Sequence, residues 1–395
     1  MNKKSVRDID LKGKKVIMRV DFNVPLDKKT RTITDDTRIT AALPTIEYIL
    51  KNNPEKLILM THLGRPDGQI KEELRLDPIA KRLQELIKSP VKKLNDCVGD
   101  EVKKQINDSK DKVILLENLR FHAQEEENDP EFAKQLASLA DLYVNDAFGT
   151  AHRAHASTEG IAHDLPAVSG FLLDKEIEYL GKTLENPDKP FAVILGGSKV
   201  SDKIGVIENL LNKANSLVIG GGMAYTFLKA QGISIGNSKL EKDKIKIAKE
   251  TLENAKKKNV SIILPIDHLI VDAIENPTRT ETTKDQNIPD GMIAVDIGPR
   301  SIELFKKALK DAKTICWNGP LGIFEMDKYA TGTKEIAEFI ITLKAKTIIG
   351  GGDTAAACAK FGLEDKMTHI STGGGASLEY MEGKILPGIA ALQDK

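Results

Sequence analysis

The feature that most constrains the fold is a regular alternation of strand-like and helix-like segments along the whole chain. Short β-branched runs typical of buried strands occur in the first half at 16–20, 56–60, 113–117 and 142–145. Segments with helical spacing lie between them at 39–52, 77–88 and 129–140, and the last two begin with an Asp-Pro start signal. The second half continues with strand-like runs at 191–195, 216–220, 261–265, 292–296, 313–317 and 346–350. This alternation predicts an α/β fold with two doubly wound parallel sheets, one in each half.

The length of 395 residues also favours two domains, because one hydrophobic core seldom serves so long a chain. The halves are separated by the polar, helix-forming segment 174–190. We interpret it as a hinge helix between two Rossmann-like domains, although a surface helix inside one domain would have the same composition. Nine of the eleven arginines precede this segment, whereas lysine is spread throughout. Since arginine binds phosphate and carboxylate in two-point geometry, we expect the first domain to bind an anion.

Charge and cysteine content narrow the possible classes of function. Lys plus Arg and Asp plus Glu both total 58, so no net charge attracts nucleic acid or an anionic membrane, and neither is expected as a partner. The N-terminal residues lack the apolar core of a signal peptide, and no run reaches the length of a membrane span. Cys97, Cys316 and Cys358 lie far apart without metal-ligand spacing. We therefore expect a soluble, cytoplasmic protein that acts on small molecules, with its cysteines in the core.

Polar residues follow the first-half strands at their carboxyl ends, where ligands bind in open α/β sheets. The segments concerned are DFNVP (21–25), HLGRP (62–66), ENLRFH (117–122) and NDAFGTAHRAH (145–155). Any one of them alone is more often an ordinary surface loop, but several on equivalent strand ends bring their charges to one edge. The pattern predicts a basic bowl lined by His62, Arg65, Arg120, His122, His152 and Arg153. Arg38 stands apart at the start of a helix.

The second-half strands run instead into glycine-rich loops, at 196–203, 220–224, 297–301, 318–322, 350–354 and 372–377. Glycine lets backbone N–H groups approach a phosphate closely, although such loops are also common connectors. The Walker A motif is missing, because Glu176 stands where the first glycine of that motif would precede Gly181-Lys182-Thr183. Asp353 follows the glycines of IIGGGDT (348–354) and is a hard oxygen ligand suited to Mg²⁺ beside phosphates.

Together these features predict a small-molecule kinase, with an anion on one lobe and a nucleotide with Mg²⁺ on the other. A NAD-dependent dehydrogenase is the alternative, because Gly350–Ala355 matches a dinucleotide fingerprint. That fingerprint calls for an acid about 20 residues further on, and HISTGGG provides none there. A non-enzymatic two-lobed binding protein is a third class, but it leaves Lys199, Lys203 and Asp353 without a role.

Eight motifs, in order through the entire chain, closely resemble those of the phosphoglycerate kinase family: VDFNVP, HLGRP, LENLRFH, AHRAHAST, GGSKVSDKIGVI, WNGPLGIFE, GGGDTAA and STGGGASLE. The departures are mild, with Ser198 where the family usually has Ala, and Leu321 and Ile323 where Met and Val are common. None of them removes a charged or metal-binding group. The resemblance implies reversible phosphoryl transfer between ATP and the carboxylate of 3-phosphoglycerate in glycolysis, giving ADP and 1,3-bisphosphoglycerate, by a hinge-bending monomer.

The resemblance also assigns residues to each part of the site. It implies a phosphoglycerate site at Asp21, Asn23, Arg38, His62, Arg65, Arg120 and Arg153. It implies a nucleotide site at Lys203, Gly298, Asn318, Glu325, Gly351, Gly352, Asp353 and Thr354, with Glu325 as the ribose ligand and Asp353 as the Mg²⁺ ligand. The catalytic set that it implies is Arg38, Lys199, Lys203, Gly350 and Gly373, where the glycines at 373–375 open a helix whose N–H groups face the transferred group.

Domain boundaries follow from the same resemblance. Residues 1–173 are expected to form the phosphoglycerate-binding domain, 174–189 the hinge helix and 190–383 the nucleotide-binding domain. Residues 384–395 are expected to pack back on the first domain, with Ile385, Leu386, Ile389 and Leu392 docked. The implied chemistry needs no general base, because the acceptor is a carboxylate with a pKa near ~4 that is already ionised at neutral pH. The first-lobe histidines are therefore expected to donate hydrogen bonds or to pack.

Overall fold

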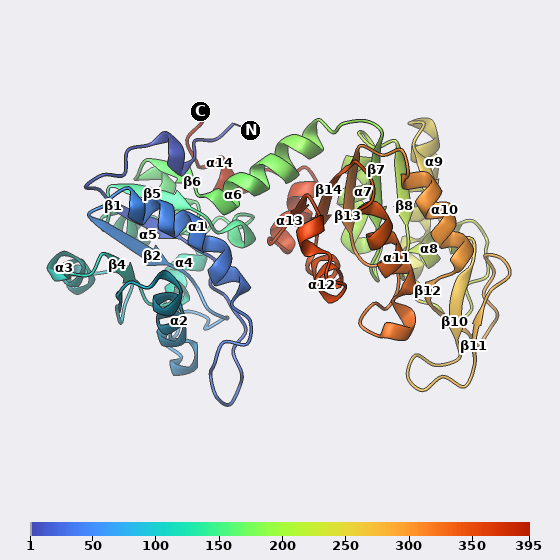
Figure 1. Cartoon of the computed structure of the whole chain (residues 1–395), viewed down its shortest axis with the longest axis horizontal. Coiled ribbons are helices and arrows are strands. Elements are labelled where there is room, and N and C mark those ends of the chain that lie inside the picture. The colour runs from blue at the N-terminus through green and yellow to red at the C-terminus, as the bar shows by residue number, and fades with distance from the viewer. Residues whose placement is uncertain (1) are drawn as a thin grey trace. The chain divides into compact units, whose positions relative to one another are not determined.

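The computed structural model describes residues 2–395, which fold into two compact units (Figure 1). The first unit contains the chain up to Glu178 together with Ile385–Lys395, and the second contains Tyr179–Lys384. The chain passes from the first unit to the second within a helical stretch that consists of α6 (Phe171–Glu176) and the π-helical turns Ile177–Thr183.

A six-stranded parallel sheet lies at the centre of the first unit, with the strand order β3-β4-β2-β1-β5-β6. The strands are β1 (Lys15–Arg19), β2 (Lys56–Met60), β3 (Val91–Lys93), β4 (Val113–Leu115), β5 (Leu142–Asn145) and β6 (Ala167–Ser169). Arg19 at the end of β1 lies beside Met60 of β2 and Asn145 of β5. The carboxyl ends of these three central strands are therefore level with one another.

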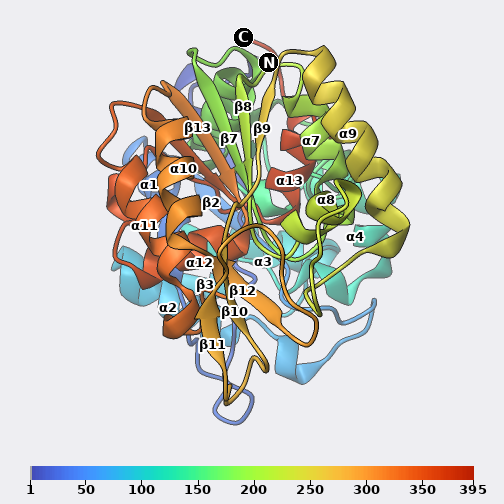
Figure 2. The same ribbon diagram turned by 90° about the vertical axis from the view of Figure 1, so that its right-hand side faces the viewer.

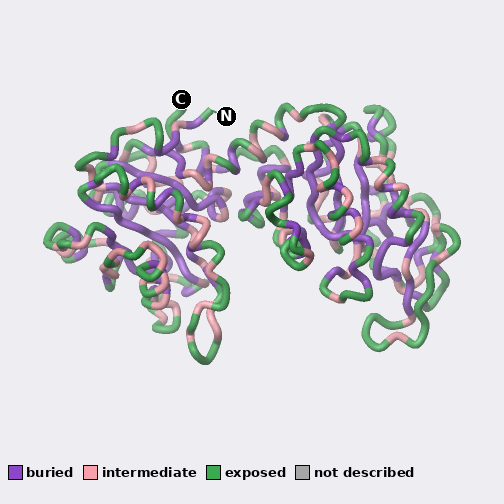
Figure 3. Tube along the Cα trace, viewed as in Figure 1, coloured by how far each residue is buried: buried purple, intermediate pink, exposed green. Residues whose placement is uncertain are grey.

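Helices pack on this sheet because its strands are apolar on both faces. They are α1 (Thr37–Lys51), α2 (Asp77–Ile87), α3 (Asp100–Asp108), α4 (Ala123–Glu126), α5 (Pro130–Ala137), α6 and the C-terminal α14 (Pro387–Ala390). Val16 and Met18 of β1 belong to the core cluster formed with α1 and α2, whereas Ile17 between them is buried on the opposite face. Figure 3 shows these central strands buried along their length.

The second unit contains a six-stranded parallel sheet with the order β15-β14-β13-β7-β8-β9 and a small antiparallel sheet with the order β11-β10-β12. The parallel strands are β7 (Phe191–Leu195), β8 (Ser216–Ile219), β9 (Ser261–Ile263), β13 (Thr314–Asn318), β14 (Lys346–Gly350) and β15 (His369–Ile370). The antiparallel strands are β10 (His268–Val271), β11 (Thr280–Thr282) and β12 (Ile293–Ile297).

The helices of the second unit are α7 (Ile204–Leu210), α8 (Ala224–Ala230), α9 (Ile245–Lys257), α10 (Pro299–Leu309), α11 (Thr331–Ile340), α12 (Gly352–Lys360) and α13 (Gly375–Met381). Figure 2 shows α10 and α11 on one side of β7 and β8, and α8 and α9 on the other. Phe305 of α10, Ile336 of α11 and Trp317 of β13 pack together in the core between these helices and the sheet.

The predicted α/β class with two parallel sheets is confirmed, but one strand was assigned to the wrong sheet. The segment predicted at 292–296 is β12, which pairs with β10 in the antiparallel sheet rather than with the parallel strands. Its residues form a largely buried, mainly apolar run like those of the parallel strands, so only its pairing partner distinguishes the two cases. No helix in the described part of the chain is both long and apolar enough to cross a membrane.

The C-terminal segment packs against the first unit through apolar and polar contacts. Leu386, Ile389 and Leu392 are at most 3% exposed. Lys3 Nζ donates to the carbonyl oxygens of Ala390 and Leu392 at 2.9 and 2.7 Å. We expected Ile385 to be docked as well, and this expectation is wrong, because its side chain is 72% exposed. Ile385 precedes the Leu386–Pro387 turn into α14 and points away from the core that the next residues fill.

We predict that deleting residues 384–395 destabilises the first unit and impairs activity, although no predicted site residue is lost. Each of the three buried aliphatic side chains contributes roughly 1.5–3 kcal/mol. The deletion also removes the Gly388 carbonyl oxygen that accepts from the buried Asn145 side chain at 3.0 Å. Urea unfolding and turnover measure the effect, with Ile385→Ser as the control that should change little. Wild-type melting and turnover in the truncated protein would contradict the prediction.

Asp146, directly after β5, is a buried carboxylate that caps α6. Its Oδ1 accepts hydrogen bonds from the backbone N–H groups of Leu172 and Leu173 at 2.8 and 3.1 Å. Burial raises the pKa of Asp146 to about 7, and the hydrogen bonds from Thr45, Leu173 and Leu172 offset that effect only in part. The carboxyl group at the beginning of the helical connection is therefore half-ionised near neutral pH.

We predict that Asp146→Asn becomes increasingly stable relative to wild type as the pH rises from 4.5 to 8. Asp146 ionises near its ordinary pKa of 3.8 in the unfolded chain but near 7 in the folded one, so its contribution to stability is lost as the pH rises through this range. The difference corresponds to a few kcal/mol, at about 1.4 kcal/mol per pH unit. Urea unfolding of both proteins at several pH values measures it. A stability difference that is independent of pH, or one reproduced by the exposed Asp164→Asn, would refute the prediction.

Candidate active site

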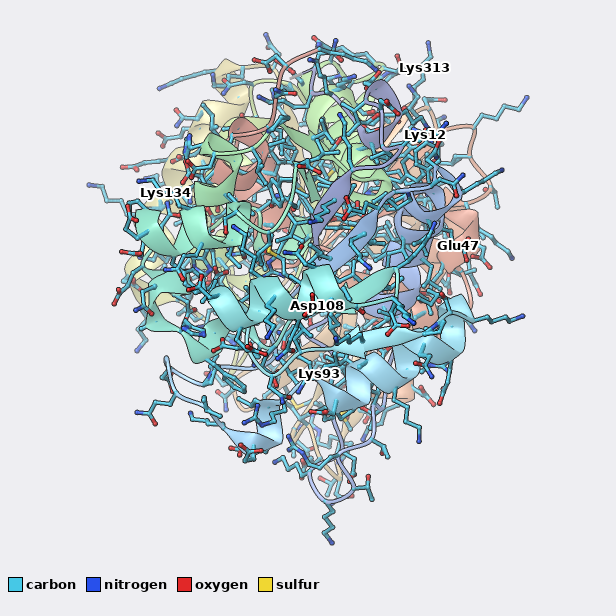
Figure 4. All side chains as sticks on the ribbon, turned by 90° about the vertical axis from the view of Figure 1, so that its left-hand side faces the viewer. Lys12, Glu47, Lys93, Asp108, Lys134 and Lys313 are labelled. Carbon is cyan, nitrogen blue, oxygen red and sulfur yellow. The ribbon has the colours of Figure 1, made fainter. Side chains whose placement is uncertain are left out.

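The residues predicted to bind an anion follow four neighbouring parallel strands of the first unit. Asp21 and Asn23 follow β1, His62 and Arg65 follow β2, Arg120 follows β4, and Arg153 follows β5. Because β4, β2, β1 and β5 are adjacent, their carboxyl ends share one edge of the sheet. Lys12 and Lys134, by comparison, lie at well-separated places on the surface of the unit (Figure 4).

Arg38, which stood apart in the sequence, joins this edge through the loop after β1. Its Nη1 donates to both carboxylate oxygens of Asp21 at 3.1 and 3.0 Å and to the Asn23 carbonyl oxygen at 3.2 Å. The Asn23 side chain in turn accepts from the backbone N–H of Gly64 at 2.9 Å, which links the loops after β1 and β2. All three Arg38 contacts use one nitrogen and 42% of the side chain is exposed, so the guanidinium retains donors for an anion.

His62 is held as a neutral hydrogen-bond donor by a buried arginine. Its Nδ1 lies 3.0 Å from Arg19 Nη2, and a guanidinium can only donate, so Nδ1 accepts and the ring proton lies on Nε2. Arg19 Nε donates to Ser157 Oγ at 2.8 Å, and Ser157 Oγ donates to the buried Glu125 at 2.6 Å. Burial, then the charges of Arg19 and Arg120, holds the pKa of His62 well below its ordinary value. The imidazole therefore stays uncharged at neutral pH and presents an N–H.

Arg120 and the loop after β2 are fixed to each other. Arg120 Nη1 donates to the Gly64 carbonyl oxygen at 3.1 Å, and Nη2 forms an ion pair with Glu126 at 3.2 Å. The Asn118 side chain bridges the same loops, because it accepts from Leu63 N–H and donates to Leu63 C=O. Arg65 is exposed in this loop. The structure thus brings together the loops that carry the predicted anion ligands of the first unit.

Two adjoining cavities, of about 400 and 240 Å³, lie in the second unit and share Gly197, Ser198 and Asp353 in their walls. The larger one is mainly apolar, with Tyr225, Val295, Pro320 and Leu321 in its wall, and its charged lining residues are Lys239, Glu325 and Asp353. An apolar cavity with a few charged groups in its wall suits a flat ring that carries hydroxyl groups.

The smaller cavity collects backbone N–H groups and lysines, as a phosphate site requires. Gly351 has φ +87°, a conformation that favours glycine, and it leads into α12, where Asp353 is exposed in the first turn. The buried Thr354 fixes this turn, because its hydroxyl accepts from Gly319 N–H at 2.6 Å. Lys203 Nζ donates to Asn318 Oδ1, and burial lowers the pKa of this lysine. Lys199 is exposed in the same wall.

Three predicted glycines lie outside the walls of these cavities. Gly350 is buried against Met381, where an added Cβ would meet the Met381 side chain at 2.7 Å. Gly373 is buried and donates its N–H to Ser371 Oγ at 3.3 Å. Gly298 precedes α10 and packs on Asp267. The neighbouring Gly351, Gly352, Gly374 and Gly375 form the wall of the smaller cavity instead.

Most residues of the larger cavity were not predicted from the sequence. Tyr225 lies on α8, while Ile293, Ala294 and Val295 lie on β12 of the antiparallel sheet. No signal in the sequence marks β12 as a ligand-binding strand, because its apolar residues read as ordinary core. The glycines at 220–222 directly before α8 were the one available pointer to Tyr225.

Two exposed carboxylates, Asp202 and Asp353, lie in the wall of the smaller cavity, and Asp353 belongs to the wall of the larger cavity as well. Among the described residues, Asp96, Cys97 and His122 also bring three possible metal-ligand atoms within 4.8 Å of one another. They lie in the first unit, and His122 Nε2 and Asp96 Oδ1 already form a hydrogen bond of 2.7 Å.

The family model of phosphoglycerate kinase matches residues 6–384. The chain belongs to the phosphoglycerate kinase family. It is 58% identical to the phosphoglycerate kinase of Dictyoglomus turgidum and 56% identical to that of Microcystis aeruginosa, with all of both chains covered in each case. Among solved structures, it resembles phosphoglycerate kinase from Coxiella burnetii, with a TM-score of 0.90, 41% identity and 98% of both chains covered. The corresponding enzyme from Pyrococcus horikoshii gives a TM-score of 0.82 at 33% identity, with the same coverage.

Membership of the phosphoglycerate kinase family confirms the predicted class of enzyme, a glycolytic phosphotransferase. ATP or ADP is accordingly a substrate, and 3-phosphoglycerate is the other. The dehydrogenase alternative finds no support, because the relatives named here are all phosphoglycerate kinases.

Proposed function

We propose that this member of the family transfers a phosphoryl group reversibly between ATP and the carboxylate of 3-phosphoglycerate, with each substrate on its own unit. The observation that carries the proposal is the division of chemistry between the units. The arginine-rich sheet edge lies in the first, and the glycine- and lysine-lined cavities lie in the second. Residues 1–173 with 384–395 form the phosphoglycerate domain, and 190–383 form the nucleotide domain.

In the first unit, Arg38, Arg65, Arg120 and Arg153 bind the two anionic groups of 3-phosphoglycerate, while Asp21 and Asn23 orient Arg38 and the substrate. His62 contributes a neutral N–H from Nε2, the orientation set by Arg19. The carboxylate acceptor is ionised at neutral pH, so no residue has to remove a proton from it. These residues therefore act by binding and orienting the substrate.

In the second unit, the larger cavity takes the base and ribose, with Glu325 accepting from ribose hydroxyls. The smaller cavity takes the phosphates, which Gly351, Gly352, Thr354 and Asn318 hold together with Lys199 and Lys203. Asp353 fits a Mg²⁺ ligand, and Mg²⁺ bound there would neutralise phosphate charge. The lysines and the N–H groups of the glycine loops stabilise the charge that develops on the transferred group.

Phosphoryl transfer needs the two substrates in line and shielded from water, because water would otherwise take the phosphoryl group. We therefore propose that segment 174–189 acts as a hinge about which the units close. Its π-helical turns at Ile177–Thr183 are the kind of irregularity found at functional hinges. We further propose that the enzyme is monomeric and cytoplasmic and that it has no nucleic-acid or membrane partners.

A coupled assay that follows ATP consumption with and without 3-phosphoglycerate tests the function. We expect ATP turnover only when both 3-phosphoglycerate and Mg²⁺ are present. Turnover that does not depend on 3-phosphoglycerate would overturn the substrate assignment. A fluorescence titration with NADH provides the negative control, and saturable binding there would reopen the dehydrogenase class.

A further inference from the structure

The turn that carries Lys199 and Lys203, the two proposed phosphate-binding lysines, is hydrogen-bonded to a residue distant in the sequence. Lys199 and Lys203 lie in the 196–203 segment between β7 and α7, and the smaller cavity has both in its wall. Between them, Val200 is 1% exposed and anchors the turn in the core. The start of the turn is held by hydrogen bonds from the Gly196 and Gly197 N–H groups to the Asn318 and Pro320 carbonyl oxygens, at 3.0 and 2.8 Å. Residues 200 and 201 receive further restraint from a side chain.

Glu241 supplies that restraint through three hydrogen bonds to two consecutive residues. Its Oε2 accepts from the backbone N–H groups of Val200 and Ser201 at 2.5 and 3.1 Å. Its Oε1 accepts from Ser201 Oγ at 2.6 Å. Burial raises the pKa of Glu241, but the donors at Ser201 and Val200 outweigh burial and the pKa is lowered. The side chain is thus a carboxylate bound by three donors.

Glu241 is anchored at its own end as well. It lies between α8 and α9, and its backbone N–H donates at 3.3 Å to the hydroxyl of Thr226, a residue of α8 that is 1% exposed. The cavity walls contain Ser198, Lys199, Asp202 and Lys203 but do not contain Glu241. Its carboxylate therefore contacts the turn without lining either cavity.

We propose that Glu241 is a positioning residue for phosphoryl transfer, which fixes the turn between Lys199 and Lys203 so that both ammonium groups meet the nucleotide phosphates. The inference rests on the proposed function. A misplacement of about 1 Å in such groups can cost about 100-fold in rate. Glu241→Ala should therefore lower kcat by about 10- to 100-fold and raise KM for ATP, while KM for 3-phosphoglycerate, which binds the other unit, stays unchanged.

Conservative variants distinguish a loss of lysine positioning from a loss of the folded structure. Glu241→Gln keeps an acceptor oxygen but loses the charge, so it should fall between Glu241→Ala and wild type. Asp243→Asn is the matched control, because Asp243 is exposed two residues further on and pairs with Lys244 rather than with the turn. It removes the same charge and should leave kcat and both KM values at wild-type levels. Thermal melting of each variant checks the fold.

A double-mutant cycle with Lys199→Ala provides the decisive measurement. If Glu241 acts through the lysines, Glu241→Gln should lower kcat less in the Lys199→Ala background than in wild type. Equal losses in both backgrounds would overturn the inference. So would wild-type kcat and ATP KM in both Glu241 variants, or an equal loss in Asp243→Asn. These outcomes differ from a failure of the proposed function. In that case the wild-type protein itself would show no turnover that depends on 3-phosphoglycerate.

Discussion

Asp353→Asn should abolish most of the kinase activity while leaving the fold intact. The side chain is exposed in the first turn of α12 and the exchange is nearly isosteric, so the free energy of unfolding should stay within about 1 kcal/mol of wild type. The lost negative charge is the one that we propose holds Mg²⁺ beside the phosphates. Without it, kcat should fall by about 100- to 1,000-fold, the range typical for loss of one charged group that stabilises a transition state.

Titration of activity with Mg²⁺ tests this role directly. In the variant, the Mg²⁺ concentration for half-maximal activity should rise strongly. Asp365→Asn is a matched control, because Asp365 is an exposed carboxylate in the turn after α12 and lies outside both cavity walls. An unchanged Mg²⁺ dependence of activity in Asp353→Asn would contradict the assignment of Asp353 as the Mg²⁺ ligand. A metal dependence that moves instead with Asp202→Asn, the other aspartate in the smaller cavity wall, would place the cation there.

The sequence predicted the parallel sheets well because their signals are local. Each central strand is a short apolar run, and α5 begins at Asp129-Pro130 as its sequence indicates. Five strands were missed, β3, β6, β10, β11 and β15, and the last two lack such signals altogether. All three residues of β11 are exposed, and β15 has only two residues, so neither shows an apolar period. Their strand conformation depends on pairing of β11 with β10 and of β15 with β14. A short stretch of sequence gives no information about such contacts between separate segments.

The candidate site, like the fold, was predicted from the sequence only in part. The carboxyl ends of adjacent parallel strands meet by topology, so the strand pattern alone was enough to group the loops after β1, β2, β4 and β5. Arg19 was missed as the partner of His62, because it is 1% exposed and arginine is seldom so buried. Its position at the end of an otherwise apolar strand was the available signal. Glu241 gave no signal, because a glutamate in a polar loop is ordinary and its partners lie 40 residues away.

Arg38 and Arg65 should separate kinetically, although both are exposed arginines of the first unit. Arg65 lies in the loop with His62, where we propose that it binds the phosphate that does not react. Its contact should be equal in the ground and transition states, so Arg65→Ala should mainly raise KM for 3-phosphoglycerate. Arg38 is oriented by Asp21, with 3.0 Å between Nη1 and Oδ2, and we propose that it meets the transferred group only when the units close.

Arg38→Ala should therefore lower kcat, by roughly 100- to 1,000-fold, which corresponds to about 3–4 kcal/mol of lost transition-state stabilisation. Arg38→Lys should restore only part of the rate, because one ammonium cannot contact Asp21 and the transferred group with the geometry of a guanidinium. Steady-state kinetics of Arg38→Ala, Arg38→Lys and Arg65→Ala with 3-phosphoglycerate varied measure the two parameters separately. If Arg38→Ala changes only KM, Arg38 binds the ground state and the transferred group equally, and the role proposed for it in the transition state is wrong.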